Sequence, residues 1–274
     1  MGRAVAPDRG GFGMTSGSTS WRRNLATLLA GALPILAVLM LWYAVCALEL
    51  APVSLLPPPD AVFGRFLVLL GDRTFLSHAG ITLFRLFAGF SIALAIGVGI
   101  GILAAGSRTV AALMQPVIRV LAPVPKIALY PAFVLTLGFD HSSKIALVVA
   151  DAVFPILLAT YQGAAAVEPK LVWSARAAGA SQTRCLFTVV LTAALPSSLT
   201  GARIGLIISC IVVFLAEMIT STDGLGQLLV RAARNFQTVD MFEPIIAISV
   251  LGLILNAAFN AVSARLLVGF SDQR

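Results

Sequence analysis

Residues 83–105 read LFRLFAGFSIALAIGVGIGILAA, and this stretch decides the class of fold. It is almost entirely apolar and is longer than the about 20 residues that a helix needs to cross about 30 Å of hydrocarbon. Its one charged residue is Arg85. Gly97 and Gly101 follow GxxxG spacing, which lets the backbones of two helices in a membrane approach closely. The stretch therefore predicts a membrane-spanning helix that packs tightly against another helix.

The composition of the whole chain agrees with this prediction. Hydrophobic residues make up 59% of the 274 residues and charged residues 11%, whereas a soluble domain has about 25% charged residues. A chain of this length has room for about five to seven spans with short loops, and for no sizeable soluble domain. We therefore expect an integral membrane protein.

The net charge of +7 raises the question of nucleic-acid binding. The basic residues, however, are scattered between apolar runs and form no basic surface with interleaved aromatic residues. In a membrane protein such an excess is better explained by topology and by contact with anionic lipid. We expect membrane lipid, and no nucleic acid, among the partners of this chain.

The sequence offers no metal or cofactor site. Cys46, Cys185 and Cys210 are far apart and form no Cys-x-x-Cys pair, which favours small apolar side chains in or near helices. His78 and His141 have no metal-ligand spacing. Because no Gly-x-x-x-x-Gly-Lys-[Ser/Thr] loop occurs, we do not expect the chain to bind ATP.

Six apolar segments predict an all-α polytopic membrane protein with about six transmembrane helices. Four prolines interrupt the third segment and predict bends, because each proline removes a hydrogen-bond donor from a helix. These prolines are Pro116, Pro123, Pro125 and Pro131. The segments are residues 25–48, 83–105, 110–137, 144–161, 196–219 and 241–267.

The N-terminal region before the first span is rich in Gly, Ser and Thr. We expect a disordered tail at residues 1–20 and a single transmembrane domain over residues 21–274. Arg22 and Arg23, which precede the first apolar segment, also fit a twin-arginine export signal. That segment is about twice as long as the usual signal-peptide core and has no clear small-residue cleavage site. We therefore favour an uncleaved first span.

The distribution of Lys and Arg predicts that both termini lie in the cytoplasm. With six spans, about ten of the 19 basic residues fall in segments on the side of the termini and about five on the other side. Cytoplasmic loops usually carry such an excess of Lys and Arg. Residues 49–82, 138–143 and 220–240 then lie outside, with an amphipathic segment at residues 62–70 on the membrane surface.

The longest inside segment, about residues 163–195, predicts two short helices that meet at an elbow. Pro169 suits the first position of a helix, and Gly179 can end that helix in the left-handed conformation. Ser181 suits the N-cap of a second helix that runs towards Leu191. Small side chains at the elbow would let its backbone lie close to a partner protein. An ordinary alanine-rich loop is the alternative on local chemistry alone.

The elbow resembles the cytoplasmic coupling motif of ABC importer permeases. That motif has Glu-Ala-Ala, three residues, Gly, nine residues and then Ile-x-Leu-Pro. The positions that fit it are Ala175, Gly179, Val189 and Leu191. Three positions depart from it: Trp173 stands in place of Glu, Ser174 in place of the first Ala, and Thr192 in place of the first Pro.

Nearly all of residues 55–267 resembles one subfamily, the nitrate/sulfonate/taurine-type permeases. The resembling segments include LPPP at 56–59, TLFRLFAGF at 82–90, PVPKIALYP at 123–131, AEM at 216–218 and GLG at 224–226. The resemblance implies a type I ABC importer permease fold in a bacterial inner membrane, with a core at about residues 77–267. It also implies four partners: a second permease copy, two ATPase subunits and an extracytoplasmic solute-binding protein.

The resemblance further implies that the elbow docks an ATPase subunit. The docking residues would be Ser174, Ala175, Arg176, Ala178, Gly179, Ala180 and Ser181. Charged groups at membrane depth are costly and usually face a cavity or a partner. The candidates for a translocation path or gate are Arg119, Lys126, Tyr130, Arg203 and Glu217. We favour the other interpretation, that several of these residues snorkel to an interface or pair internally, for example Arg203 with Glu217, although the spacing of these two disfavours a direct contact within one helix.

The expected function is ATP-driven import of a small anion such as an aliphatic sulfonate, taurine or nitrate, with ATP hydrolysis on a separate subunit. The same machine importing a pyrimidine precursor or an aromatic acid is the alternative cargo. A stand-alone secondary transporter is the alternative from another class, but the sequence shows no internal repeat and no dense set of buried acids. No Ser/His or His/Asp/Glu constellation indicates an enzyme.

Overall fold

The computed structural model describes residues 19–268 and residue 270, with side chains from residue 33 onward. All regular structure in this part of the chain is helical, which confirms the predicted fold class. The chain forms two compact units, Met1–Asp60 and Ala61–Arg274. The predicted tail lies outside the described residues except for Thr19 and Ser20, where helix α1 begins.

The first unit consists of α1 (Thr19–Ala47) and the segment that follows it. Trp42 Nε1 donates a hydrogen bond to the carbonyl oxygen of Pro57 at 3.1 Å, so the chain turns back along the end of the helix. The turn begins at Glu49, whose φ is 51°. The described apolar part of α1, Leu33–Ala47, is shorter than a membrane span.

The second unit contains the helices that are long and apolar enough to cross a membrane. Among the described residues there are four: α3 (Arg73–Gly106), α6 (His141–Ala165), the stretch Gln182–Thr220 and α11 (Thr238–Leu266). A fifth span results if α4 (Arg108–Leu121) is joined to Lys126–Leu137, which comprises η1 (Lys126–Leu129) and α5 (Tyr130–Leu137). Length and composition therefore give four or five spans, and the predicted number of six is not confirmed.

The bend predicted from the prolines is present. The axes of α4 and of Lys126–Leu137 differ by 86°. Pro123 and Pro125 lie in the break, and Pro131 occupies the first turn of α5, where its missing N–H has no intrahelical partner to lose. The prolines thus explain both where the helix breaks after α4 and where α5 begins.

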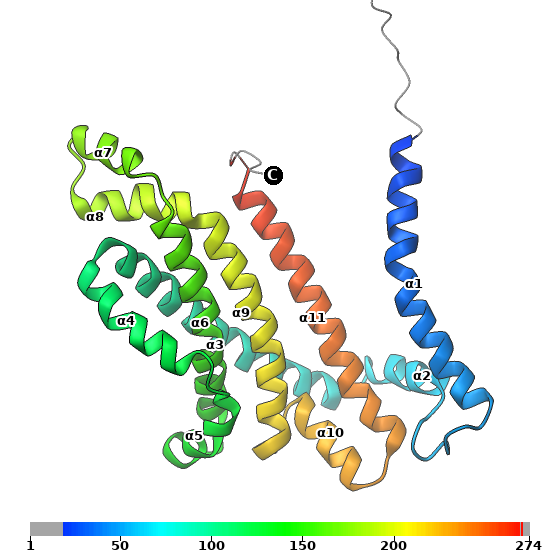
Figure 1. Ribbon diagram of the computed structural model, residues 1–274. Helices are drawn as coiled ribbons and strands as arrows, with labels where there is room; N and C mark the ends of the chain where they lie inside the picture. Colours follow the sequence, from blue (N-terminus) through cyan, green and yellow to red (C-terminus); the bar gives the residue numbers. More distant parts are fainter. Residues whose placement is uncertain (1–18, 269, 271–274) are drawn as a thin grey trace, which may run out of the picture. The chain divides into compact units, whose positions relative to one another are not determined.

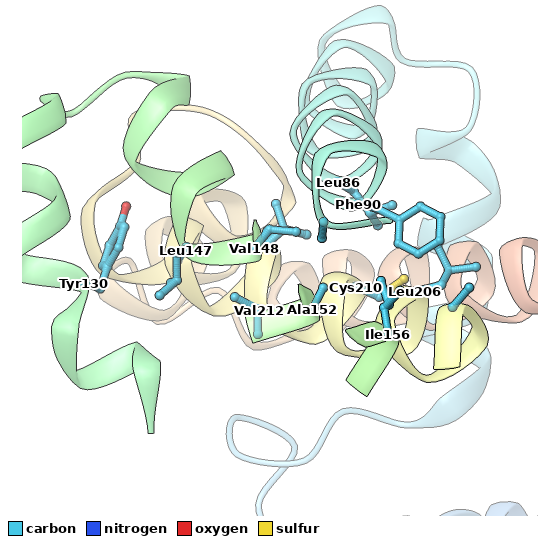
Figure 2. Close-up of a cluster of buried hydrophobic side chains, with 14 of the residues drawn as sticks. Leu86, Phe90, Tyr130, Leu147, Val148, Ala152, Ile156, Leu206, Cys210 and Val212 are labelled. Carbon is cyan, nitrogen blue, oxygen red and sulfur yellow. The ribbon is translucent and has the colours of Figure 1, made fainter. Parts of the chain in front are cut away.

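Helix α6 packs along α3 and along α9 (Leu191–Thr220), and these three helices hold the main core. Glycines allow the close approach: a Cβ on Gly97 of α3 would lie 2.8 Å from Ile156 Cγ2, and one on Gly205 of α9 would lie 2.8 Å from Ile156 Cδ1. Gly201 and Gly205 of α9 form a second GxxxG pair, and both pairs therefore face the same helix, α6. Figure 2 shows Ile156 in this core with Phe90 and Leu206.

Short helices lie at both ends of the second unit (Figure 1). At one end are α7 (Pro169–Ala177) and α8 (Gln182–Cys185), and Leu186 Cδ2 lies 2.5 Å from where a Cβ on Gly106 at the end of α3 would be. At the other end is α10 (Leu225–Arg234), where the backbone N–H of Gly224 donates to His78 near the start of α3. Helix α2 (Pro59–Leu69) forms the amphipathic segment predicted near residues 62–70.

Three boundaries differ clearly from the sequence prediction. Helix α3 begins at Arg73 rather than at residue 83. The fifth span does not begin at Pro196, because α8, the π-helical turn η2 (Leu186–Val190) and α9 form one helical stretch, with Pro196 inside α9. The second elbow helix is therefore the start of the span. Residues 220–240 were expected to be a loop but contain α10, whose Leu225, Leu229 and Ala232 bury one face at helical spacing.

Candidate functional site

The predicted elbow is a hydrogen-bonded turn between α7 and α8. Gly179 has φ +86°, its N–H donates to Arg176 O at 2.9 Å, and the N–H of Ala180 donates to Ala175 O at 3.0 Å. This pair of bonds is a Schellman motif, which satisfies the last carbonyls of α7. The Ser181 hydroxyl then accepts from the N–H of Arg184 at 3.3 Å and caps α8. The glycine and the cap predicted from the sequence are both confirmed.

One face of the elbow is exposed, and the opposite face packs against the helices of the second unit. Helix α7 has no fully buried residue, and Trp173, which stands where the resembling motif has Glu, is 66% exposed. Val172 and Leu186 pack against a small core of Ile102, Ala164, Val190 and Ala194. Of the predicted docking residues, five are exposed and two are half-buried. The exposed ones are Ser174, Arg176, Ala178, Gly179 and Ser181; the half-buried ones are Ala175 and Ala180.

The five residues predicted for a path or gate do not come together in one place. Arg119 is exposed on α4. Arg203 is exposed on α9, and its Nε donates to Asn256 Oδ1 on α11 at 2.9 Å. Tyr130 is fully buried, with its hydroxyl 2.7 Å from Thr220 Oγ1, so it joins the start of α5 to the end of α9.

Lys126 lies at the break between α4 and α5 and is 8% exposed. Its Nζ donates to Ala122 O at 3.0 Å and lies 3.4 Å from Asp151 Oδ1. The same ammonium lies 4.7 Å from the centre of the Phe154 ring, which is within cation–π range. Lys126 thus attaches the break to α6 by several contacts.

Glu217 is fully buried, and its partner is Arg85 rather than Arg203. Arg85 Nη1 donates to Glu217 Oε1 at 2.8 Å, with the two side chains 1% and 0% exposed. The Thr82 hydroxyl lies 2.9 Å from Glu217 Oε2, and the N–H of Gly226 donates to the same oxygen at 3.1 Å. The sequence suggestion that Arg203 pairs with Glu217 is therefore wrong.

Arg85 also binds the loop after α9. Its Nη2 donates to Asp223 Oδ1, its Nη1 donates to Asp223 O at 3.2 Å, and its Nε donates to His141 Nδ1 at 3.0 Å. One guanidinium therefore joins α3 to α6, α9 and the loop at residues 221–224. We call Arg85, Glu217, Asp223 and Thr82 the outer cluster, after the side on which the distribution of Lys and Arg predicts residues 220–240 to lie.

The loop at residues 221–226 fits tightly over this cluster. Gly224 has φ +96°, and its N–H donates to His78 Nδ1 at 2.9 Å. A Cβ on Gly226 would lie 2.4 Å from the carbonyl oxygen of Phe214, so only glycine allows the loop to approach α9 this closely. The N–H of Leu225 donates to Thr82 Oγ1 at 2.9 Å. This hydrogen bond attaches the first residue of α10 to α3.

The charge of Asp223 is stabilised by the cluster. Burial alone would raise the pKa of Asp223, but the hydrogen bond and positive charge of Arg85 hold that pKa below its ordinary value of 3.8. Sequence reasoning missed Asp223 and His78 as partners of this site. The available signal was Arg85 itself, the one charge in the apolar stretch 83–105, because such a charge needs a partner.

Comparison with protein families gives one match. The family described as "Binding-protein-dependent transport system inner membrane component" matches residues 97–268. These residues include the elbow, Glu217 and α10.

Two curated proteins are similar over most of their length. The taurine transport system permease protein TauC of Escherichia coli (strain K12) is 32% identical over 253 residues, which cover 90% of this chain and 92% of TauC. The putative aliphatic sulfonates transport permease protein SsuC of Bacillus subtilis (strain 168) is 30% identical over 239 residues, or 87% of each chain.

Among solved structures, a chain of the MetNI methionine ABC transporter in an inward-facing conformation is similar in fold. The TM-score is 0.62 at 19% sequence identity, with 71% of this chain and 97% of that chain covered. The fold is therefore that of a type I ABC importer permease.

Proposed function

Because the chain belongs to the family of binding-protein-dependent transport system inner membrane components, we propose that it is the permease of an importer for a small organic sulfonate. The relatives TauC and SsuC are named for taurine and for aliphatic sulfonates, and they support this substrate class. A stand-alone secondary transporter, the alternative from another class, has no support in this family.

The elbow is the surface that we assign to an ATPase subunit. The docking residues remain the seven that the resemblance implies, and Trp173 lies beside them as a large exposed side chain. Small residues and a hydrogen-bonded turn favour a groove on a partner protein, because the backbone can approach closely without ordering long side chains. A cavity of about 320 Å³ behind the elbow is lined by Trp173, Arg176 and Leu186 among others.

One observation carries the mechanism: the helix from Gln182 to Thr220 is continuous over 39 residues. It starts at the elbow and contains Glu217 near its far end. At about 1.5 Å per residue, it reaches across the membrane as one rod. Movement of the elbow by ATPase closure would therefore be transmitted along α9 to the outer cluster by rigid-body motion.

A second copy of the permease completes the pathway in this proposal. Only 6% of the apolar window of α11 is buried, although this helix is long and apolar enough to cross a membrane. A groove of about 580 Å³ between α9 and α11 is lined almost entirely by apolar side chains, including Cys210, Phe214 and Leu253. Two ATPase subunits and an extracytoplasmic binding protein complete the assembly, and ATP is hydrolysed on the ATPase subunits.

The cytoplasmic side is proposed to be the side of the elbow. The excess of Lys and Arg in the segments on that side supports both termini in the cytoplasm. Loop 221–226 and α10 then lie on the outer side, at the other end of α3 from the elbow.

Co-purification tests this proposal. The tagged permease is extracted in mild detergent from its native cells and its companions are identified by mass spectrometry. An ATPase subunit in equal amount is the expected result. A permease that purifies alone in several detergents, with its own fold intact by thermal unfolding, contradicts the proposal.

A further inference from the structure

Arg203 is a charged, exposed side chain in the interior of α9. It lies about 18 Å along the helix from Leu191 and about 25 Å from Thr220, at about 1.5 Å per residue. The helix dipole does not explain a cation at this position, because that effect is confined to the ends of a helix. A charge at membrane depth is costly in lipid and faces a cavity or a partner.

The guanidinium uses one of its three nitrogens inside the protein. Arg203 Nε donates to Asn256 Oδ1 on α11 at 2.9 Å. In the part of the chain that the structure describes, Nη1 and Nη2 form no hydrogen bond, and Arg203 takes part in no ion pair. These two nitrogens form the planar fork that suits an oxyanion.

The acids of the spanning helices are not free to neutralise Arg203. Among the described residues, each of these acids already lies beside a basic partner. The pairs are Asp151 with Lys126, Glu217 with Arg85, and both Asp240 and Glu243 with Arg65. A second copy of the chain would carry the same pairs. The counter-charge of Arg203 therefore has to come from a molecule other than the permease.

The helix that Arg203 contacts has its polar side chains on one face. Within residues 245–262 of α11, these side chains are Ser249, Asn256 and Asn260, and their positions follow helical spacing. A polar stripe through an apolar span is expected beside a water-filled path and not beside lipid.

Asn256 and Ser249 also line the groove of about 580 Å³ between α9 and α11. This volume falls within the roughly 300–1,000 Å³ of small-molecule sites. The remaining lining residues are apolar, among them Ile207, Gly252 and Leu253. Because Asn256 belongs to the groove and is bonded to Arg203, an apolar surface and a cation with free donors adjoin on the same two helices.

We propose that Arg203 is a substrate-binding residue of the translocation path and that it binds the sulfonate group of a small organic sulfonate. Nη1 and Nη2 donate to the sulfonate oxygens, Asn256 orients the guanidinium, and the aliphatic part of the substrate lies along the groove. The choice of a sulfonate rests on the function proposed above; the need for an anion rests on the unmatched charge of Arg203.

Ligand-observed NMR tests the site directly. The full-length permease in nanodiscs of neutral lipid is titrated with methanesulfonate and, separately, with butanesulfonate, and saturation transfer to the ligand, corrected with empty nanodiscs, gives each Kd. Arg203→Gln is expected to weaken both ligands at least about tenfold, because charged hydrogen bonds are lost. Arg265→Gln, on an exposed arginine in the last turn of α11, is expected to leave both Kd values unchanged.

Arg203→Lys separates binding of an anion from a purely structural contact. Lysine keeps the positive charge but not the planar fork, so its Kd values are expected to lie between those of the wild type and Arg203→Gln. Binding by Arg203→Lys as weak as by Arg203→Gln would overturn the role of the charge. No saturable binding by the wild type, or equal binding by Arg203→Gln, would overturn the site.

The groove has its own test. Butanesulfonate is expected to bind the wild type more tightly than methanesulfonate, by up to roughly fourfold for each added CH2 group. Gly252→Leu fills the groove at a position where a Cβ meets nothing within 4 Å, and is expected to remove this gain while leaving methanesulfonate unchanged. Equal affinity of the wild type for both ligands would overturn the placement of the aliphatic part.

A lipid headgroup offers the same oxyanion chemistry as a free sulfonate. Methanesulfonate is therefore also titrated in nanodiscs that contain phosphatidylglycerol, and unchanged affinity is expected. Loss of binding there would assign Arg203 to lipid and overturn the proposal. The proposed function fails separately: a permease that binds sulfonate but never an ATPase keeps this site, and one that binds an ATPase but no sulfonate keeps the function.

Discussion

Arg85 on α3 and Glu217 on α9 form an ion pair of 2.8 Å in which neither side chain is more than 1% exposed. Glu217 lies near the end of the Gln182–Thr220 helix that is farther from the elbow. Both side chains of the pair also form hydrogen bonds with the backbone at the start of α10: Arg85 with Asp223 O, and Glu217 with the N–H of Gly226. A buried pair of this kind is costly to break from one side, because the remaining charge has no partner.

Replacement of Arg85 by Met is therefore expected to destabilise the permease by about 3–5 kcal/mol. The thermal unfolding temperature in detergent measures this loss. Arg73→Met is the matched control, since Arg73 is an exposed arginine of the same helix, and its unfolding temperature is expected to stay that of the wild type. An Arg85→Met variant as stable as the control would contradict the structural role of the pair.

The contribution of Asp223 is expected to depend on pH. Because its pKa in the folded protein is below the ordinary 3.8, the stabilisation is fully present above that value and is lost as the pH falls through the lower, folded value. Asp223→Asn should therefore lower the unfolding temperature at about pH 7, and the difference from wild type should shrink below about pH 3.8. A difference that grows on acidification would show that another group is responsible.

A methyl group at Gly226 is expected to disrupt the loop over the outer cluster. The added Cβ would lie 2.4 Å from Phe214 O, a backbone atom that cannot move by itself, so Gly226→Ala should cost about 1–3 kcal/mol. Gly80→Ala is the control, because nothing lies within 4 Å of a Cβ at Gly80. Equal unfolding temperatures for the two variants would mean that the loop adjusts without cost.

The conformation of the elbow is tested at one position. Gly179 has φ +86° with open space around it. The backbone conformation, and not the size of the side chain, therefore restricts which residues can stand at this position. Gly179→Asn should be tolerated, because Asn adopts the left-handed conformation, whereas the β-branched side chain of Gly179→Val should distort the turn. Co-purification of the ATPase subunit is expected to survive the first change and to fall with the second, while the amount of permease in the membrane stays the same. Normal co-purification of Gly179→Val would remove the elbow from the docking surface.

Single cysteines test the proposed orientation. In a chain whose Cys46, Cys185 and Cys210 are replaced by Ala, Ala178→Cys is expected to react with an impermeant maleimide only from the cytoplasmic side. Phe236→Cys, at a position 92% exposed after α10, is expected to react only from the outside. The reverse pattern would invert the topology.

The sequence predicted those features that depend on local chemistry. Gly179, Ser181 and the proline break each follow from a backbone rule that acts within a few residues. The apolar runs also located four of the spans, and a fifth if α4 is joined to Lys126–Leu137, although the predicted start of the fifth segment was wrong because a π-helical turn joins it to α8.

The contacts between distant segments were not predictable in the same way. Arg85 and Glu217 are separated by 132 residues, and the sequence alone does not select Glu217 over another acid. Burial and pairing of charges are properties of the tertiary structure. The sequence could therefore indicate which residues are charged at membrane depth, but not which of them lie together.

The most direct test of the function is uptake of radiolabelled taurine by proteoliposomes that contain the permease with its ATPase subunits and the binding protein. Uptake that requires hydrolysable ATP, and that stops when ATP is replaced by a non-hydrolysable analogue, is the predicted result. Uptake by the permease alone, driven by a proton or sodium gradient without ATP, would contradict the account.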